Sequence, residues 1–98
     1  MGVYKLSALC DEDIGRIYEY GIEQFGLKKA KEYIFGLHES FESLAIQNFM
    51  GLDASELTPE LRRLTFKSHM IFYFTTDYGA FIIRVLHQSM DYQRHFSK

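Results

Sequence analysis

Apolar residues in the first half of the chain recur at the spacing of two amphipathic helices. Ser7 can cap the first helix, because its hydroxyl can accept a hydrogen bond from an unpaired backbone N–H of the first turn. Gly26 suits the end of that helix. The second helix begins almost at once, which predicts an antiparallel hairpin. The two apolar stripes are Cys10, Ile14, Ile17, Tyr18, Gly21 and Phe25, then Ala30, Tyr33, Ile34, Leu37, Phe41, Leu44 and Ala45.

A glycine inside the second helix, Gly36, predicts close packing of this helix against the first, since glycine otherwise weakens a helix. Residues 48–60 are irregular, because Gly51 and Pro59 interrupt any period. The rest of the chain has the alternating, aromatic and β-branched runs typical of strands. The predicted strands are residues 3–6, 61–66, 69–75 and 80–87, with a hairpin turn at residues 77–79.

The order of these elements predicts an α+β fold in one domain spanning residues 1–98. It has an N-terminal strand, an antiparallel two-helix hairpin, and a three-stranded antiparallel meander with a short C-terminal helical tail at residues 90–96. The helices would cover one face of the sheet and leave at least part of the other open. An aromatic-rich sheet with an uncovered face indicates a partner that covers it.

Composition is that of an ordinary soluble domain, with 47% apolar and 24% charged residues. Cys10 is the only cysteine, so no intrachain disulfide can form, as is usual in reducing compartments. The start of the chain lacks the apolar run of a signal peptide. The longest apolar run, residues 70–74, is far too short to span a bilayer. We therefore expect a cytoplasmic protein with no membrane association.

The net charge of −2 conceals an asymmetry along the chain. Residues 1–57 carry five Lys/Arg against ten Asp/Glu, a net charge of −5. Residues 58–98 carry six Lys/Arg against three Asp/Glu, a net charge of +3, and three of the four histidines. A basic half can attract nucleic acid or an acidic protein, but the same numbers also fit an ordinary mixed surface.

Arg84 interrupts the apolar strand at residues 80–87. Strict alternation places Ile82, Arg84 and Leu86 on one face of the sheet. The other face would then carry Ile83, Val85 and His87. A charged residue among apolar neighbours must be paired or reach solvent. The structural interpretation is a salt bridge to Asp91 or to a helix carboxylate, and the functional one is a cation presented to a phosphate or a partner carboxylate.

The polar residues that follow this strand are His87, Asp91, Arg94 and His95. Such a group is compatible with RNA cleavage, with His as acid or base and Arg stabilising the developing charge. It is equally compatible with a protein-binding tip, or with hydrogen bonds that merely pin the tail. The histidines lack metal-site spacing, and Cys10 lies on an apolar stripe as a core residue does. We expect no catalytic residue, metal or cofactor.

The ending of the chain is the most specific part of its sequence, with Arg84-Val85-Leu86-His87, Met90-Asp91 and Arg94-His95-Phe96. Together with Leu61-Arg62-Arg63-Leu64, the run from Ser68 to Tyr73, and the opening Tyr4-Lys5-Leu6-Ser7, it resembles the ParE branch of the ParE/RelE family. These are toxins of bacterial type II toxin–antitoxin pairs. Family members often have Asn-Pro after the second helix and a basic residue after the glycine of the following loop. This chain departs from that pattern, because Asn48 is followed by Phe49 and Gly51 by Leu52.

The resemblance implies a non-enzymatic toxin that poisons DNA gyrase, with the A subunit as the expected contact, and blocks replication. Such pairs serve plasmid stabilisation. It also implies a cognate ParD-like ribbon-helix-helix antitoxin, which would wrap the toxin and through which alone DNA would be contacted. The alternatives are a RelE-like ribosome-dependent mRNA endoribonuclease and a non-toxic antitoxin-binding regulatory module. On this basis the expected target-binding residues are Met90, Asp91, Arg94, His95 and Phe96, supported by Arg84 and His87, and the expected antitoxin-binding residues are Tyr18, Phe72 and Phe74.

Overall fold

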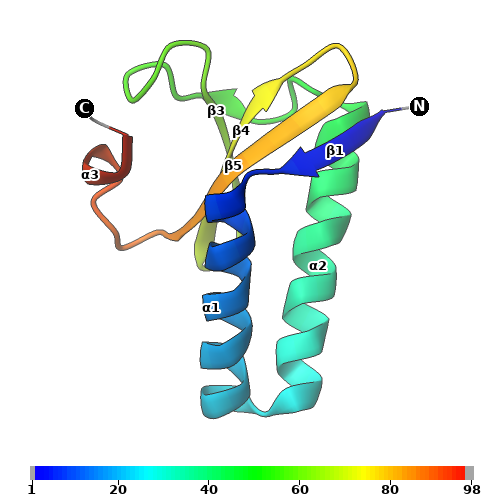
Figure 1. Cartoon of the computed structure of the whole chain (residues 1–98), viewed down its shortest axis with the longest axis vertical. Helices are drawn as coiled ribbons and strands as arrows, with labels where there is room; N and C mark the ends of the chain where they lie inside the picture. The colour runs from blue at the N-terminus through cyan, green and yellow to red at the C-terminus, as the bar shows by residue number, and fades with distance from the viewer. Residues whose placement is uncertain (1, 97–98) are drawn as a thin grey trace.

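A computed structural model describes residues 2–96 and confirms the α+β class (Figure 1). Two long helices stand side by side as a hairpin, and a twisted sheet lies across one end of them. The elements are β1 (Val3–Leu6), α1 (Ala8–Phe25), α2 (Leu27–Ile46), β2 (Leu52–Asp53), β3 (Arg62–Phe66), β4 (His69–Thr75), β5 (Gly79–His87) and α3 (Gln93–Phe96). No helix of the described part is long and apolar enough to cross a membrane.

The sheet has five strands in the order β1-β5-β4-β3-β2. The predicted antiparallel meander of β3, β4 and β5 is confirmed. The N-terminal strand joins this sheet by pairing parallel to β5, so the sheet is mixed. The two-residue strand β2 lies in the segment predicted to be irregular, where it pairs with Arg62 and Arg63. Such a short strand leaves no periodicity in the sequence and is defined only by its partner.

The helices pack one face of the sheet as their apolar stripes predict. Ser7 caps α1 by accepting a hydrogen bond from the backbone N–H of Cys10 at 3.0 Å, and Gly26, with a positive φ of 91°, joins the two helices. The prediction that Gly36 packs against the first helix is wrong. A Cβ there would lie 2.8 Å from Phe66 of β3, whereas Gly21 is the glycine that lets α1 approach Ala30 of α2.

The second face of the sheet is covered by the chain itself, which corrects the expectation of an open face. Leu61, Phe72 and Leu86 are fully or almost fully buried there with Ala54. The rings of Tyr92 and Phe96 lie at centroid distances of 5.0 and 4.9 Å from Phe72. The C-terminal tail therefore closes the smaller of two hydrophobic clusters, and Phe72 is not open to a partner as the sequence had suggested.

A bulge in β5 alters the predicted faces of the strand. Tyr73 pairs with Ile82 but the preceding Phe72 pairs with Arg84, which leaves Ile83 as an extra residue. Ile82 and Val85 consequently belong to the helix-side core, while Ile83 and Leu86 pack in the opposite cluster. Strict alternation therefore fails at Ile83, since one inserted residue exchanges the faces of all residues before it.

The hydroxyl of Tyr73 fixes the loop that links α2 to β2. Tyr73 is fully buried, donates a hydrogen bond to the carbonyl oxygen of Asn48 at 2.8 Å, and accepts one from the backbone N–H of Gly51 at 3.0 Å. The two backbone groups lie three residues apart, so one side chain holds both ends of the turn. Strand β4 thereby determines the path of a loop that has no regular structure of its own.

We predict that Tyr73→Phe lowers the free energy of unfolding by about 1–3 kcal/mol, because it strands the Gly51 N–H and the Asn48 carbonyl without a partner. Urea unfolding measures the change. Tyr20→Phe is the control, since Tyr20 is 62% exposed. A shift at Tyr73 no larger than the shift at Tyr20 would contradict the proposed role of this hydroxyl.

Candidate protein-binding site

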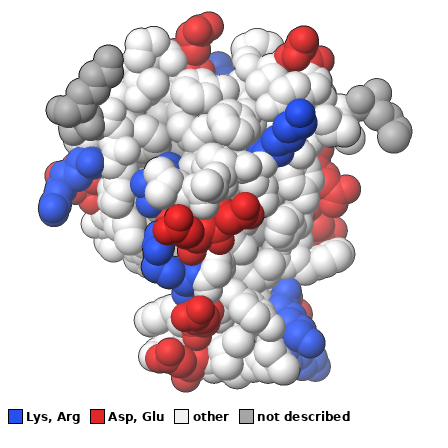
Figure 2. Space-filling model, in the orientation of Figure 1, with Lys and Arg blue, Asp and Glu red and all other residues white. Residues whose placement is uncertain are grey.

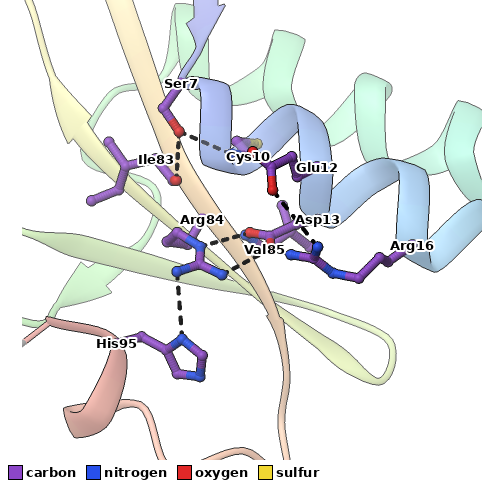
Figure 3. Close-up of polar contacts among 9 residues, drawn as sticks. All are labelled: Ser7, Cys10, Glu12, Asp13, Arg16, Ile83, Arg84, Val85 and His95. Atoms are coloured by element: carbon purple, nitrogen blue, oxygen red, sulfur yellow. Dashed lines mark hydrogen bonds and ion pairs between the residues drawn. The ribbon is translucent and has the colours of Figure 1, made fainter.

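Arg84 is held by a carboxylate of α1 in a two-pronged ion pair (Figure 3). Its Nε and Nη2 donate to Oδ2 and Oδ1 of Asp13, each at 2.8 Å. The exposed fractions of the two side chains are 12% and 4%. The expected salt bridge to a helix carboxylate is therefore confirmed, and the alternative partner Asp91 is not the one used. The hydrogen bonds to Asp13 raise the pKa of Arg84 above its usual value.

Asp13 also accepts hydrogen bonds from two other groups. The backbone N–H of Val85 donates to Oδ2 at 3.0 Å, and Nη2 of Arg16 donates to Oδ1 at 3.1 Å. The buried carboxylate thus has four donors, which is the arrangement that makes a buried charge tolerable. The charges of Asp13 and Arg84 therefore neutralise each other within the fold, which makes Arg84 first of all a scaffold residue.

The predicted target-binding residues lie in the tail that follows β5. Nδ1 of His95 lies 3.4 Å from Nη1 of Arg84, which ties α3 to the ion pair (Figure 3). Asp91 accepts a hydrogen bond from the backbone N–H of Gln93. Met90, Asp91, Arg94 and His95 are exposed, with 46% of Met90 accessible. Phe96 instead packs on Phe72, so it anchors the surface that the other four residues display.

His69 and His87 meet across β4 and β5, with ring centroids 5.3 Å apart. Nδ1 of His69 lies 2.7 Å from the hydroxyl of Tyr33, and Nδ1 of His87 accepts from the backbone N–H of Ser89. Burial lowers the pKa of His69 below its usual value, and the neighbouring His87 lowers it further. Of the three histidines singled out in the sequence, two therefore pair with each other and His95 meets Arg84. Within the described residues, no three His, Cys, Asp or Glu side chains are grouped to hold a metal.

A groove of about 540 Å³ runs from this histidine pair along the helix hairpin. Apolar and aromatic side chains of both helices form one wall, among them Tyr20, which is 62% exposed. Lys29 of α2 and Lys67 of the β3–β4 turn supply positive charge, against the single carboxylate of Glu32. An adjoining groove continues past Ile17 and His69 to Arg84, Met90 and His95. The shape and charge of this surface suit an acidic, amphipathic peptide segment.

Cys10 is fully buried, as its place on the helix stripe predicts. Burial, reinforced by the nearby carboxylates of Asp13 and Asp11, raises the pKa of its thiol to about 12. A thiol with such a pKa stays protonated at neutral pH. Cys10 is therefore a packing residue and offers no nucleophile.

Comparison with known proteins assigns the chain to a family. The family described as the ParE toxin of the type II toxin–antitoxin system parDE matches residues 4–92. The chain belongs to this family of toxins.

Relatives of the chain span nearly its whole length. Toxin ParE1 of Caulobacter vibrioides is 34% identical over 95 residues, which cover 97% of this chain and 98% of the relative. Toxin ParE1 of Mycobacterium tuberculosis is 30% identical over 92 residues, which cover 93% and 94%. A chain in the structure of the chromosomal ParDE TA system from P. aeruginosa has the same fold, with a TM-score of 0.76 at 19% identity over 89% of this chain and 96% of that one. The resemblance to the ParE family and the α+β fold class are thus confirmed.

Asp13 is the site residue that the sequence analysis missed. Its burial could have been predicted from the sequence, because Asp13 follows Cys10 by three residues and precedes Ile17 by four. It therefore lies on the buried stripe of α1. A carboxylate on an apolar stripe requires a buried cation, and Arg84 is the one charged residue in an apolar strand. A buried carboxylate on a helix and a buried arginine in a strand, considered together, predict the ion pair between Asp13 and Arg84.

Removing the carboxylate of Asp13 is expected to destabilise the fold. Asp13→Ala leaves the Arg84 guanidinium and the Val85 N–H without a buried acceptor, which we expect to cost about 3–5 kcal/mol in unfolding free energy. Replacing the pair by apolar residues, Asp13→Leu with Arg84→Met, should recover most of this loss. Asp11→Ala is the control, since Asp11 is exposed on the same helix. An Asp13→Ala protein as stable as Asp11→Ala would refute this role for the ion pair.

Lowering the pH is expected to destabilise the fold through His69. Unfolded His69 takes up a proton near the usual pKa of 6.5, while folded His69 does so only at lower pH. Between these values the unfolded state binds more protons, so the free energy of unfolding falls as the pH falls through this window. His69→Gln should flatten the decline that urea unfolding measures from about pH 7 to about pH 5. Equal slopes for the wild type and His69→Gln would contradict the assignment.

Proposed function

We propose that this ParE-family chain arrests bacterial growth by binding DNA gyrase, with the A subunit as its contact, and so blocks replication. It works as a protein inhibitor in the cytoplasm, where gyrase acts, and needs no cofactor. A ParD-like ribbon-helix-helix antitoxin neutralises it. Family membership and the similarity to a chain of a ParDE assembly support the toxin–antitoxin part of this proposal.

The observation that carries the proposal is that the cations of the sheet are already engaged in structural contacts. Arg84 is paired with Asp13. Arg62 donates to the carbonyl oxygens of Phe49 and Gly51. Arg63 lies 3.8 Å from Glu56. A ribonuclease needs convergent groups that are free to exchange protons and hold a phosphate, so these contacts favour inhibition by binding over RNA cleavage.

The exposed residues of the tail are the proposed contact with gyrase. Tyr92 and Phe96 fix the tail to the sheet through Phe72, and His95 touches Arg84. A surface that is fixed before binding loses little conformational freedom on association. Met90 then supplies an apolar contact, and Asp91, Arg94 and His95 supply polar ones.

The groove along the helix hairpin is the proposed seat of the antitoxin. Its aromatic wall and its lysines fit an acidic segment laid along α1 and α2. Tyr18 is half-buried on α1, outside the lining of this groove, and stays a candidate contact. Phe72 and Phe74 pack instead in the cluster on the opposite face of the sheet, where the tail covers Phe72. DNA would be reached only through the antitoxin.

Substitutions in the exposed tail test the proposal without removing the buried anchors. Met90→Ala with Arg94→Ala should abolish growth arrest in bacteria that lack the antitoxin, and should abolish inhibition of gyrase supercoiling by purified protein. The matched control is Leu27→Ala with Lys28→Ala, which removes a similarly exposed apolar residue and a base from the hairpin tip. The control protein should remain toxic.

Three results would change the conclusion. Full toxicity of the tail variant would exclude the tail as the target contact. Cleavage of mRNA in a translation extract, with supercoiling unaffected, would favour the RelE-like endoribonuclease. A wild-type chain that binds the antitoxin but neither arrests growth nor inhibits gyrase would identify a regulatory module.

A further inference from the structure

The loop after α2 displays a cluster of apolar side chains to solvent. Ile46, Phe49, Met50 and Leu52 are exposed by 68%, 72%, 41% and 68%. We call these four residues the loop patch. Scattered exposed apolar residues are normal on a protein surface, but four within seven positions indicate a surface that meets another molecule.

The backbone beneath the loop patch is held in one conformation by the surrounding side chains. Tyr73 bonds to Asn48 and Gly51 as described, and a Cβ at Gly51 would lie 2.6 Å from the Tyr73 hydroxyl. The side-chain amide of Asn48 donates to the carbonyl oxygen of Gly79 at 2.8 Å. Arg62 donates to the carbonyl oxygens of Phe49 and Gly51, and its guanidinium lies 4.9 Å from the centre of the Phe49 ring.

These hydrogen bonds distinguish the loop patch from the tip of a flexible loop. The backbone groups that a mobile loop would leave to water are satisfied by buried or half-buried side chains. The apolar side chains project outwards from that frame. Anchors fixed in this way lose little entropy when a partner covers them, which is the property of an interaction surface.

Charge identifies the chemistry of the partner. Residues 33–63, which include the whole loop patch, carry five Asp/Glu against Arg62 and Arg63, a net charge of −3. Arg62 is engaged by the loop carbonyls and Arg63 by Glu56. Glu42 lies one turn before Ile46, Asp53 follows Leu52, and Glu56 and Glu60 are exposed in the next loop. Figure 2 shows acidic side chains at the top of the molecule, with a basic one below them at the upper right, and further basic ones at the lower right, over the start of α2.

We infer that the loop patch is a second contact with the cellular target of the toxin, and that it accepts an apolar protein surface bordered by Lys or Arg. The inference rests on the proposed function, because an enzyme that handles DNA carries basic surface. An acidic antitoxin segment is disfavoured at the loop patch by like charges and is matched instead by the lysines of the helix groove. The loop patch and the helix groove thus suit partners of opposite charge.

Two pairs of variants test the inference by growth arrest in bacteria without antitoxin. Phe49→Ser with Leu52→Thr removes the most exposed anchors. Its matched control is Leu9→Ser with Phe35→Ser, which removes equally apolar side chains that are 51% and 66% exposed on the helices. Asp53→Lys reverses one charge at the edge of the patch, and Glu19→Lys reverses an exposed charge on α1. Asp53→Lys leaves the apolar anchors in place and so keeps the test decisive if the double variant is unstable.

The expected result is a gain of about tenfold or more in survival for the patch variant and for Asp53→Lys, and none for either control. Thermal unfolding and antitoxin binding should remain those of the wild type. Undiminished arrest by both patch variants would overturn the inference. So would loss of antitoxin binding with arrest retained, which would assign the patch to the antitoxin. A wild-type chain that dimerises in solution, with patch variants that do not, would assign the patch to a second copy of the chain.

The gyrase assay separates this inference from the proposed function. If the patch variants lose growth arrest while the wild-type protein leaves supercoiling unaffected, gyrase is not the target and the inference stands. If the wild type and the patch variants inhibit supercoiling equally, the proposed function stands and the inference fails. A wild-type chain without any toxicity would overturn the inference as well.

Discussion

The start of helix α1 completes the edge of β5 where β1 ends. Strand β1 pairs with β5 only as far as Ile82. Beyond that residue, the Ser7 hydroxyl donates to the carbonyl oxygen of Ile83 at 2.7 Å, and Asp13 accepts from the N–H of Val85. The same Asp13 then neutralises Arg84. One turn and a half of helix therefore supplies the hydrogen bonds that a longer first strand would otherwise have to provide.

The bulge at Ile83 is part of the same constraint. It places Arg84 opposite Phe72, on the side of the sheet away from the helices. Because β1 has ended, the guanidinium can still reach Asp13 at the edge of β5, and there it also meets His95 of α3. Helix α1, the sheet and the C-terminal tail are consequently joined at one point. Arg84 therefore stabilises the fold through its contacts with Asp13 and His95.

The three surfaces proposed for partners differ in their charge and in the residues that hold them in place. The helix groove has lysines and aromatic side chains, the tail has Met90 and Arg94 on an aromatic anchor, and the loop patch has apolar residues among carboxylates. Buried aromatic residues support two of them, Phe72 beneath the tail and Tyr73 beneath the loop patch. This organisation suits a toxin whose action and neutralisation are both protein–protein binding events, as proposed for this chain.

The sequence by itself determined the helices, the meander of β3 to β5, the burial of Cys10 and the ParE family. These features depend on local periodicity, on capping at Ser7 and Gly26, and on the family-specific sequence of residues 84–96. Each of these signals involves residues that are close together in the chain. Only the tertiary structure decided the partner of Arg84, the parallel pairing of β1, the strand β2 and the burial of Phe72. Each of these depends on residues far apart in the chain, where one inserted residue at Ile83 reverses the faces of a strand and a tail of a few residues decides whether a sheet is open. The physical reason is that periodicity reports which side of an element is buried, whereas the group that buries it is chosen by packing.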